Sequence, residues 1–366
     1  MDFRFWILDF GLEKKSMGKR SRIRWLDSGS DNPKSQIQNP KWIRRVTLII
    51  AFVICGAMAT AQQPAKIPRV GKLIGASLSA DSARTEAFRQ GLRELGYVEG
   101  KNIVLELRSA EGKLDRLPAL AAELVRLKVD IIVTAGPIPT RAAKEATTTI
   151  PIVMTRDPDP VAPGFVASLA RPGGNITGLS TLAPELSGKR LELLKEVIPK
   201  VSRVAVFGTS TYPGNAQSLK EVELAAKAFK VQLQYLDVLD SKDIETAFRA
   251  ASKGRADAVL FMVAGGVATA HQTEIAELTV KSRLPVIYAD SRYVDAGGLM
   301  SYATNVFDLD RRAATYVDKL LKGRTPADLP VEQPMKFEFI INLIAAKRIG
   351  LTIPPNVLVR ADRVIR

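Results

Sequence analysis

Two short stretches of this sequence carry polar residues at places where a small molecule could bind. Thr134-Ala135-Gly136-Pro137 and Thr155-Arg156-Asp157 each end an apolar run that is rich in β-branched residues and too short for a helix. We expect both runs to be buried parallel strands, with residues 140–147 as the crossover helix between them. In an open parallel sheet, small molecules bind beyond the carboxyl ends of the strands.

Gly136 is the residue of this unit that most directly suggests a ligand. A glycine lets backbone approach a bound molecule closely, and free N–H groups at the start of the next helix favour a carboxylate. The alternative is that Ala-Gly-Pro only forms a tight turn between strand and helix.

Few residues could catalyse a reaction. The only histidine, His271, is expected on a helix after Gly266 as a surface or capping residue, because general-base catalysis needs a positioned partner. Asp157 and Asp159, separated by Pro158, could form a paired acid or a cation site, but a loop that turns at proline explains them more simply. The sequence has no Gly-x-Ser-x-Gly elbow, P-loop or Gly-x-Gly-x-x-Gly fingerprint. We therefore predict no enzyme, no cofactor and no metal site.

Composition and charge are those of a folded globular protein. The chain has 366 residues, of which 46% are hydrophobic and 25% charged, which is enough for two domains of ordinary size. The net charge of +15 could suggest nucleic acid, but the basic residues are scattered and aromatic residues make up only 6%. The single cysteine, Cys55, excludes a disulfide framework.

The N-terminal 61 residues are expected to lie outside the fold. Residues 1–40 lack sustained periodicity and are expected to be disordered or not translated. Residues 41–61 have the layout of a secretory signal, with a basic flank, an apolar run and small residues before the cleavage point. The run of about 13 residues is shorter than the roughly 20 that span a bilayer, so a retained anchor is the less favoured alternative. The mature chain is expected to begin near Gln62, in the periplasm.

From residue 66 onward, strands and helices alternate. The first series has strands at 70–74 and 102–107, a helix through Phe88 and Leu92 that Asp81 or Ser82 could cap, and a helix at 114–127. A short helix is expected at 163–170. A second series runs from Leu186 to a strand at 286–288, with further strands at 204–207, 233–238 and 258–263 and helices at 217–229, 243–251 and 274–280. The pattern predicts an α/β fold with two doubly wound parallel-sheet lobes.

Several long segments resemble the ABC-transporter substrate-binding proteins of the tryptophan/tyrosine-type group. They include AFRQGLRELGYVEGKNI, VASLARPGGNITGLSTLAPELSGKRLELLKE and RRAATYVDKLLKGRTPADLPVEQPMKFEFIINL, and the match covers almost all of residues 66–366. The resemblance implies a type I periplasmic-binding-protein fold with a three-strand hinge near residues 177–181, 299–304 and 331–339. One lobe would hold residues 66–178 with 302–332, and the other residues 179–301 with 333–366.

The same resemblance implies a function. Such proteins capture a solute in the periplasm, often an amino acid, aromatic or not, or a related carboxylate, and deliver it to an ABC permease and its ATPase. The chain is expected to be a monomer. Two alternatives stay open: an enzyme on a similar two-lobed scaffold, such as a racemase, and a sensory ligand-binding module.

A receptor of this kind needs hydroxyl and N–H groups for a carboxylate, an acid for an ammonium, and an apolar or aromatic wall. Tyr212 could stack on a ring and Asp290 could pair with an ammonium. At 207–209 and 264–266 this chain departs from many members, which have Trp-Asn-Pro and a proline-containing loop, so the ligand's identity stays open. The strand ends give these candidates: Ser77, Ser79, Ala135, Gly136, Thr155, Asp157, Thr181, Thr209, Tyr212, Gly265, Asp290 and Tyr302.

Overall fold

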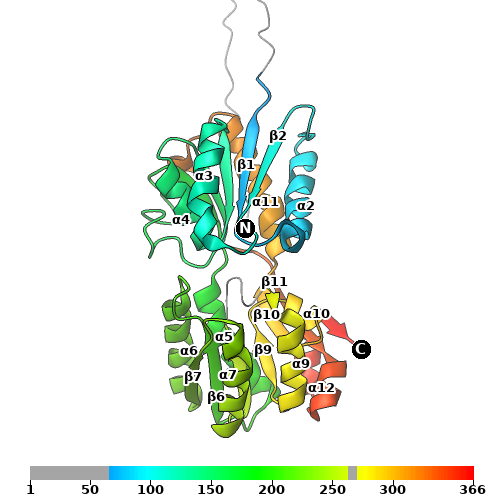
Figure 1. The fold of residues 1–366 in the computed structure, drawn as a ribbon. Helices are drawn as coiled ribbons and strands as arrows, with labels where there is room; N and C mark the ends of the chain where they lie inside the picture. The colour runs from blue at the N-terminus through cyan, green and yellow to red at the C-terminus, as the bar shows by residue number, and fades with distance from the viewer. Residues whose placement is uncertain (1–65, 263–269) are drawn as a thin grey trace, which may run out of the picture. The chain divides into compact units, whose positions relative to one another are not determined.

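The computed structural model describes residues 66–262 and 270–366, which fold around two separate β-sheets (Figure 1). The expectations for residues 1–61 and for Gly265 lie outside these residues. Within the described part of the chain, no helix combines the length and apolar character needed to cross a membrane.

The first sheet has five strands, and each neighbouring pair is parallel. Its central strands are short and apolar, so both faces must be covered by helices. The predicted β-α-β unit around Gly136 is confirmed, because its two strands pair directly from Ile132 with Ile152 to Ala135 with Thr155. The strand order is β2 (Val104–Ser109), β1 (Arg69–Ile74), β3 (Ile131–Ala135), β4 (Ile152–Asp157) and β5 (Ile176–Ser180).

Four helices cover the first sheet. On one face, α2 (Leu78–Glu94) and α11 (Val306–Leu321) bury Phe88 and Leu309 against Val70. On the other, α3 (Leu117–Arg126), which follows a 3-10 turn η1 (Leu114–Arg116), and α4 (Pro137–Ala146) share a second core. A helix from late in the chain thus packs on the sheet that contains β1.

The second sheet has seven strands and is parallel except where β10 meets β11. The change of direction arises because β11 follows the long excursion through α11 and enters the sheet from the opposite end. The strand order is β12 (Arg363–Ile365), β11 (Phe337–Asn342), β10 (Met300–Thr304), β9 (Val286–Tyr288), β8 (Ala258–Phe261), β6 (Arg203–Gly208) and β7 (Gln232–Asp237).

Helices also cover both faces of the second sheet. The core on one face takes residues from α5 (Ala183–Val197), α6 (Asn215–Phe229), α12 (Leu343–Ile349) and α13 (Pro355–Leu358). The core on the other takes residues from α7 (Ser241–Lys253), α9 (Gln272–Ser282) and α10 (Arg292–Asp295). The predicted α/β fold with two doubly wound sheets is confirmed.

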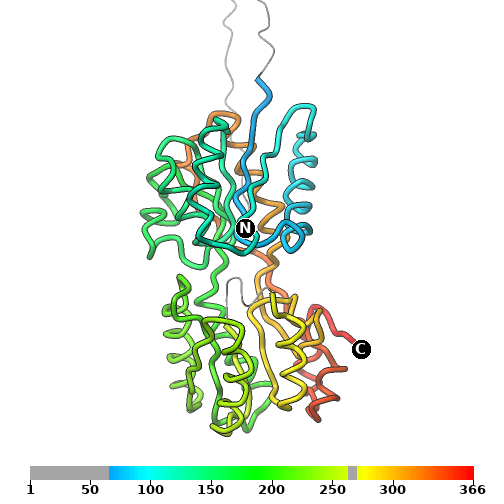
Figure 2. Tube along the Cα trace, in the orientation of Figure 1, coloured from blue at the N-terminus to red at the C-terminus, as the bar shows by residue number. Residues whose placement is uncertain are grey.

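The chain passes between the sheets at three places, which Figure 2 traces after β5, after β10 and before β11. The three segments are hydrogen-bonded to one another. Ser180 N–H donates to Glu332 O at 3.0 Å, Thr304 Oγ1 donates to Thr181 O at 2.7 Å, and Asn305 N–H donates to Lys336 O at 3.1 Å. The predicted lobe boundaries after residues 178 and 301 fall inside β5 and β10, and the one after residue 332 falls just before β11.

Two local predictions are wrong. Residues 163–170 form turns and bends instead of a helix, because Gly164 takes a left-handed φ of 69°, which interrupts the helical backbone after the turn that Asp159 caps. The N-cap of α2 is Ser77, whose side chain accepts the Ala80 N–H. Asp81 therefore lies inside the first turn of α2, where it is buried.

The contact between α2 and α11 depends on Gly91. A Cβ at this position would lie 2.1 Å from Arg311 O and 2.9 Å from the Ala314 Cβ. We expect Gly91→Ala to lower the free energy of unfolding by about 1 to 2 kcal/mol, because the overpacking exceeds the gain in helix propensity. Urea denaturation should show this loss, while Gln90→Ala on the exposed side of α2 should change stability by less than about 0.5 kcal/mol. A Gly91→Ala protein as stable as the wild type would contradict the packing.

Candidate functional site

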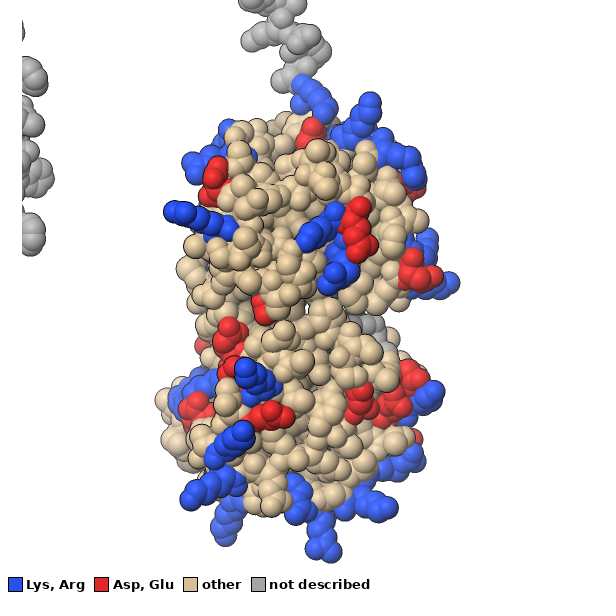
Figure 3. Space-filling view, turned by 90° about the vertical axis from the view of Figure 1, so that its left-hand side faces the viewer, with Lys and Arg blue, Asp and Glu red and all other residues tan. Residues whose placement is uncertain are grey.

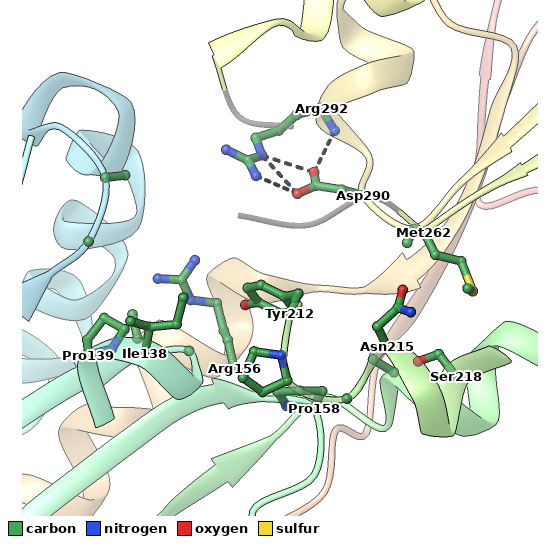
Figure 4. A pocket seen from close by; sticks show the side chains of 18 of the residues that line it. Ile138, Pro139, Arg156, Pro158, Tyr212, Asn215, Ser218, Met262, Asp290 and Arg292 are labelled. Carbon is green, nitrogen blue, oxygen red and sulfur yellow. Dashed lines mark hydrogen bonds and ion pairs between the residues drawn. The ribbon is translucent and has the colours of Figure 1, made fainter. Parts of the chain in front are cut away.

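A pocket of about 300 Å³ lies between strand ends of the first sheet and strand ends of the second. Ile74, Ala135 and Arg156 come from the carboxyl ends of β1, β3 and β4, and Phe261 from that of β8. Residues of α5 and of the loop before α6 complete its wall. The volume is at the lower end of the range for small-molecule sites, which runs from about 300 to 1,000 Å³. Figure 4 shows residues from both sheets around one space.

A cluster of buried charges forms the first-sheet side of this pocket. Lys72 and Asp81 are each only 1% exposed, and Lys72 Nζ lies 2.8 Å from Asp81 Oδ2 and 2.7 Å from Thr85 Oγ1. On the other oxygen of Asp81, Arg84 Nε lies at 2.9 Å and Arg156 Nη2 at 3.5 Å. Three cations therefore share one carboxylate.

Asp310, in α11, is the second acid of this cluster. It is 1% exposed, its Oδ1 lies 3.2 Å from Thr155 Oγ1, and its Oδ2 lies 3.5 Å from Arg156 Nε. Asp310 Oδ2 and Arg156 Nε have no hydrogen-bond partner among the described residues. Arg156 is therefore held loosely by Asp81 and Asp310, in ion pairs of 3.5 Å that reach the outer limit of a hydrogen bond.

The pKa values of the cluster follow from burial and from these charges. Burial would raise the pKa of Asp81, but Lys72, Arg156 and Arg84 together outweigh it and hold that pKa below its ordinary value. Burial lowers the pKa of Lys72, although Asp310 and Asp81 oppose this change. Burial, followed by the field of Arg156, lowers the pKa of Arg84 to about 10.

The backbone at Arg156 explains how its side chain reaches the pocket. The pairing of β4 with β5 shifts register between Met154 and Asp157, and Arg156 takes a φ of 58°, in the left-handed region. That conformation is uncommon for a residue other than glycine and often marks a functional position. The irregular strand end buries Thr155 and Asp157 and leaves Arg156 lining the pocket.

Arg190, Asp290 and Arg292 form the charged part of the second-sheet side. Asp290 Oδ2 lies 2.6 Å from Arg292 Nη2 and 3.0 Å from its Nε, so the two side chains form a close pair. Burial would raise the pKa of Asp290, but hydrogen bonds from Arg292 hold it below its ordinary value. Arg190 is 2% exposed and donates to Tyr302 O at 2.7 Å and to Ser187 Oγ at 3.1 Å. Burial lowers the pKa of Arg190 to about 10.

Aromatic side chains give the pocket an apolar surface. Tyr212 lies in the loop before α6, and its hydroxyl oxygen would be 3.6 Å from a Cβ at Gly136. Burial, with the field of Asp157, raises the pKa of its phenol to about 12. Phe261 and Tyr293 also line the pocket, with ring centroids 5.1 Å apart. The amide of Asn215 also lines the pocket. It lies seven positions after Gly208, where many of the proteins that this sequence resembles have an asparagine.

The start of α4 offers less to an anion than the sequence suggested. Pro137 and Pro139 occupy its first and third positions and carry no N–H. The Thr140 N–H donates to Gly136 O at 3.3 Å, and the Gly136 N–H to Thr155 O at 2.9 Å. Anion binding in this pocket must therefore rely mainly on arginine side chains.

The predicted residues divide into two groups. Ala135, Gly136, Tyr212 and Asp290 line the pocket. The others are placed elsewhere: Ser77 caps α2 and contacts Ser79, Thr209 donates to Val238 O, and the backbone carbonyls of Thr181 and Tyr302 accept bonds from Thr304 and Arg190. Thr155 and Asp157 are buried behind the wall. The sequence reasoning missed all four arginines of the lining: Arg84, Arg156, Arg190 and Arg292.

The residues weighed for catalysis have structural roles. His271 Nδ1 lies 2.8 Å from Glu274 Oε2 at the start of α9. Asp159 binds turn N–H groups, and its own N–H donates to Asp157 Oδ1 at 3.3 Å. On the face drawn in Figure 3, acidic and basic side chains are interspersed over the residues that the structure describes, so that face has no basic stripe.

Comparisons with known proteins agree with this architecture. The chain is 26% identical over 264 residues to a tyrosine-binding protein of Clostridioides difficile strain R20291, covering 72% of this chain and 75% of the relative. A solved conserved domain protein from Vibrio cholerae O1 biovar El Tor strain N16961 is 30% identical with a TM-score of 0.75, covering 82% of this chain and all of the other. An ABC domain from Streptococcus pneumonia, solved in complex with L-Trp, is 24% identical with a TM-score of 0.75, covering 81% and 99%.

The fold is therefore that of the type I periplasmic binding proteins, as predicted. The profile of one family, described as ABC transporter substrate binding protein, matches residues 74–365. That match covers nearly all of the residues that the structure describes and includes both sides of the pocket. The chain belongs to the ABC transporter substrate-binding protein family.

Proposed function

We propose that this chain captures a small solute bearing a carboxylate, such as an amino acid, and delivers it to an ABC permease and its ATPase. Residues 41–61 would direct export to the periplasm and then be removed. The receptor would act as a monomer and would catalyse no reaction.

The observation that carries this proposal is the composition of the pocket wall. Arg156 and Gly136 come from elements of the first sheet, whereas Arg190, Tyr212 and Asp290 come from elements packed on the second. A solute bound there would contact both halves at once. Charged groups beside aromatic faces suit a small molecule with an anionic end and an apolar body. The names of the relatives, which refer to tyrosine and L-Trp, support such a solute.

The mechanism would be a hinge equilibrium. The lobes would be residues 66–178 with 302–332 and residues 179–301 with 333–366, and the three hydrogen-bonded segments between the sheets would be the hinge. A solute that contacts both lobes favours the closed form by its differential affinity for that form. The permease would then recognise the closed surface.

Thermal-shift titration with single amino acids and small carboxylates, combined with small-angle scattering, tests the proposal. A true solute at a hundredfold excess over its dissociation constant should stabilise the protein by about 2.7 kcal/mol and should reduce its radius of gyration. Mass spectrometry of small molecules released from the purified protein extends the panel. If no solute binds and the scattering profile never changes, the receptor function must be abandoned.

Tyr212→Ala should weaken binding of the solute found in that screen about tenfold, because the variant loses an aromatic contact worth roughly 1.4 kcal/mol. Calorimetry of the two proteins measures the ratio. Thr211→Ala, at the exposed neighbouring position, should leave affinity unchanged. Equal affinities for wild type and Tyr212→Ala would show that the ring does not contact the solute.

A further inference from the structure

The charged side chains that line the pocket do not balance. Arg84, Arg156, Arg190 and Arg292 face it together with only two acids, Asp81 and Asp290. Lys72 and Asp310 lie behind the wall, where Lys72 pairs with Asp81 and Asp310 with Arg156. Their opposite charges cancel in the sum. Two positive charges are left over. A buried cation without a counter-charge is costly, so such an excess normally marks a site for an anion.

The first surplus cation belongs to the first-sheet side. Lys72, Arg84 and Arg156 there face Asp81 and Asp310. The bonds of Lys72 and Arg84 to Asp81 are 2.8 and 2.9 Å, whereas both contacts of Arg156 are 3.5 Å. Arg156 Nε is also without a hydrogen-bond partner among the described residues. Arg156 is therefore the group on this side with free capacity for a ligand.

The second surplus cation is Arg190, on α5. Among the described residues its hydrogen bonds go to two neutral oxygen atoms, Tyr302 O and Ser187 Oγ, so three of its five N–H groups make no bond to those residues. Asp290 acts on Arg190 through its charge, but Arg292 engages Asp290 through both of its oxygen atoms. Arg190 thus faces the pocket as an unneutralised charge that is almost fully buried.

Among the described residues, the pocket lining holds no acid besides Asp81 and Asp290. Residues 263–269, VAGGVAT, contain no charged side chain. Asp157 is buried behind the wall and does not line the pocket. Glu111 is engaged at the start of α2, where its Oε1 accepts the Leu78 N–H at 3.1 Å.

We propose that the solute of this receptor carries two anionic groups, one bound by Arg156 on the first-sheet side and the other by Arg190 on the second-sheet side. This inference rests on the proposed receptor function and narrows its ligand class. Arg156, on β4, and Arg190, on α5 beside the second sheet, would each gain an anionic partner only when the pocket is closed around such a dianion. A neutral or zwitterionic solute would leave at least one of them unpaired.

Both dicarboxylates and phosphorylated carboxylates present two anionic groups. Isothermal titration calorimetry at pH 7.5 should use succinate, glutarate and adipate as one arm and 3-phosphoglycerate as the other. Monomethyl succinate, monomethyl glutarate, monomethyl adipate, glycerol 3-phosphate and L-tyrosine supply the comparisons with one anionic group. We expect at least one compound with two anionic groups to bind about 100-fold more tightly than its counterpart with one. The arm that contains it identifies the anionic group.

Variants assign the two ends. Arg156→Gln and Arg190→Gln should each weaken binding of the tightest dianion about 100-fold. The counterpart with one anionic group contacts only one of the two arginines, so its affinity should fall in one variant and change much less in the other. Arg171→Gln, at an exposed position outside the pocket, is the matched control. If Arg190→Gln does not fold, Arg190→Lys keeps the charge without the planar fork and should show a smaller loss.

The outcomes separate this inference from the broader function. If L-tyrosine or a monoester binds as tightly as every dianion, or if both glutamine variants retain wild-type affinity, the two-anion ligand is refuted and the receptor function stands. If no compound binds and the wider amino-acid screen is also negative, the receptor function itself fails and the inference fails with it.

Discussion

Replacing Asp81 with asparagine should lower the free energy of unfolding by about 3 to 5 kcal/mol, because it removes the carboxylate that, among the described residues, pairs with the nearly fully buried Lys72. Thr85 Oγ1 would remain as a partner of the ammonium, but a hydroxyl cannot neutralise its charge. Arg84 would lose its ion pair at the same time. Chemical denaturation at pH 7 measures the loss.

The double variant Lys72→Met/Asp81→Asn is the informative comparison. It removes both charges of the buried pair and should recover part of the stability that Asp81→Asn loses. Lys72→Met alone should be milder, since Asp81 would keep Arg84 at 2.9 Å and Arg156 at 3.5 Å. If Asp81→Asn were as stable as the wild type, the buried charge cluster could not have the arrangement described.

The sign of the pH dependence at Asp81 provides a second check. Its pKa in the folded protein lies below the ordinary value of 3.8, so its contribution is present above about pH 4 and is lost as the pH falls further. Asp81→Asn should remove that part of the acid-induced loss. The variant should also bind solute poorly, because Asp81 contacts two of the four lining arginines.

The strands and their division into two series could be predicted from sequence because the pattern is local. Runs such as 131–133 and 152–154 are apolar, β-branched and too short for helices, and each becomes a buried strand. The error at 163–170 is also local in origin. Pro163 and Gly164 begin that stretch, and the left-handed backbone of Gly164 ends the turn before a helix can continue.

The arginines could not be located from strand ends alone. Simple alternation places Thr155 and Asp157 together, and only the register shift beside β5 turns Arg156 to the pocket. Arg190 lies within α5, and its position depends on the carbonyl of Tyr302, 112 residues away. These are tertiary effects, which no single segment encodes.

One sequence signal for the charged cluster was available. Lys72 lies among the buried residues of the strand RVGKLI, and a lysine in a buried strand requires a nearby acid. Asp81, nine residues later, is the first acid after it in the chain. Treating Asp81 as the partner of Lys72, instead of as a helix cap, would have pointed to the wall that also holds Arg84.

The buried carboxyl of Asp157 should make the protein more stable as the pH is lowered from 8 to 5. Burial is the main cause that raises the pKa of Asp157 from an ordinary 3.8 to about 7. The charge of the Asp159 carboxylate raises this pKa further, whereas the hydrogen bond from the Asp159 N–H lowers it. Its Oδ2 has no hydrogen-bond partner among the described residues, so the bond from the Asp159 N–H to Oδ1 and the field of Arg141 offset burial only in part. A carboxyl whose pKa rises on folding favours the native state while protonated and disfavours it as the pH approaches 7.

With 1.36 kcal/mol for each pKa unit, the two units between pH 5 and 7 correspond to about 3 kcal/mol of stability lost on going to neutral pH. In Asp157→Asn this slope should vanish, because an amide does not titrate. The slope is the measurement to trust, since the new amide N–H groups would themselves need acceptors in the space around Oδ2. Asp115→Asn, at an exposed position, should keep the wild-type slope. If wild type and Asp157→Asn lose stability in parallel from pH 5 to 8, the carboxylate of Asp157 is not the group that titrates, and its burial must be relieved by water that reaches it from the pocket.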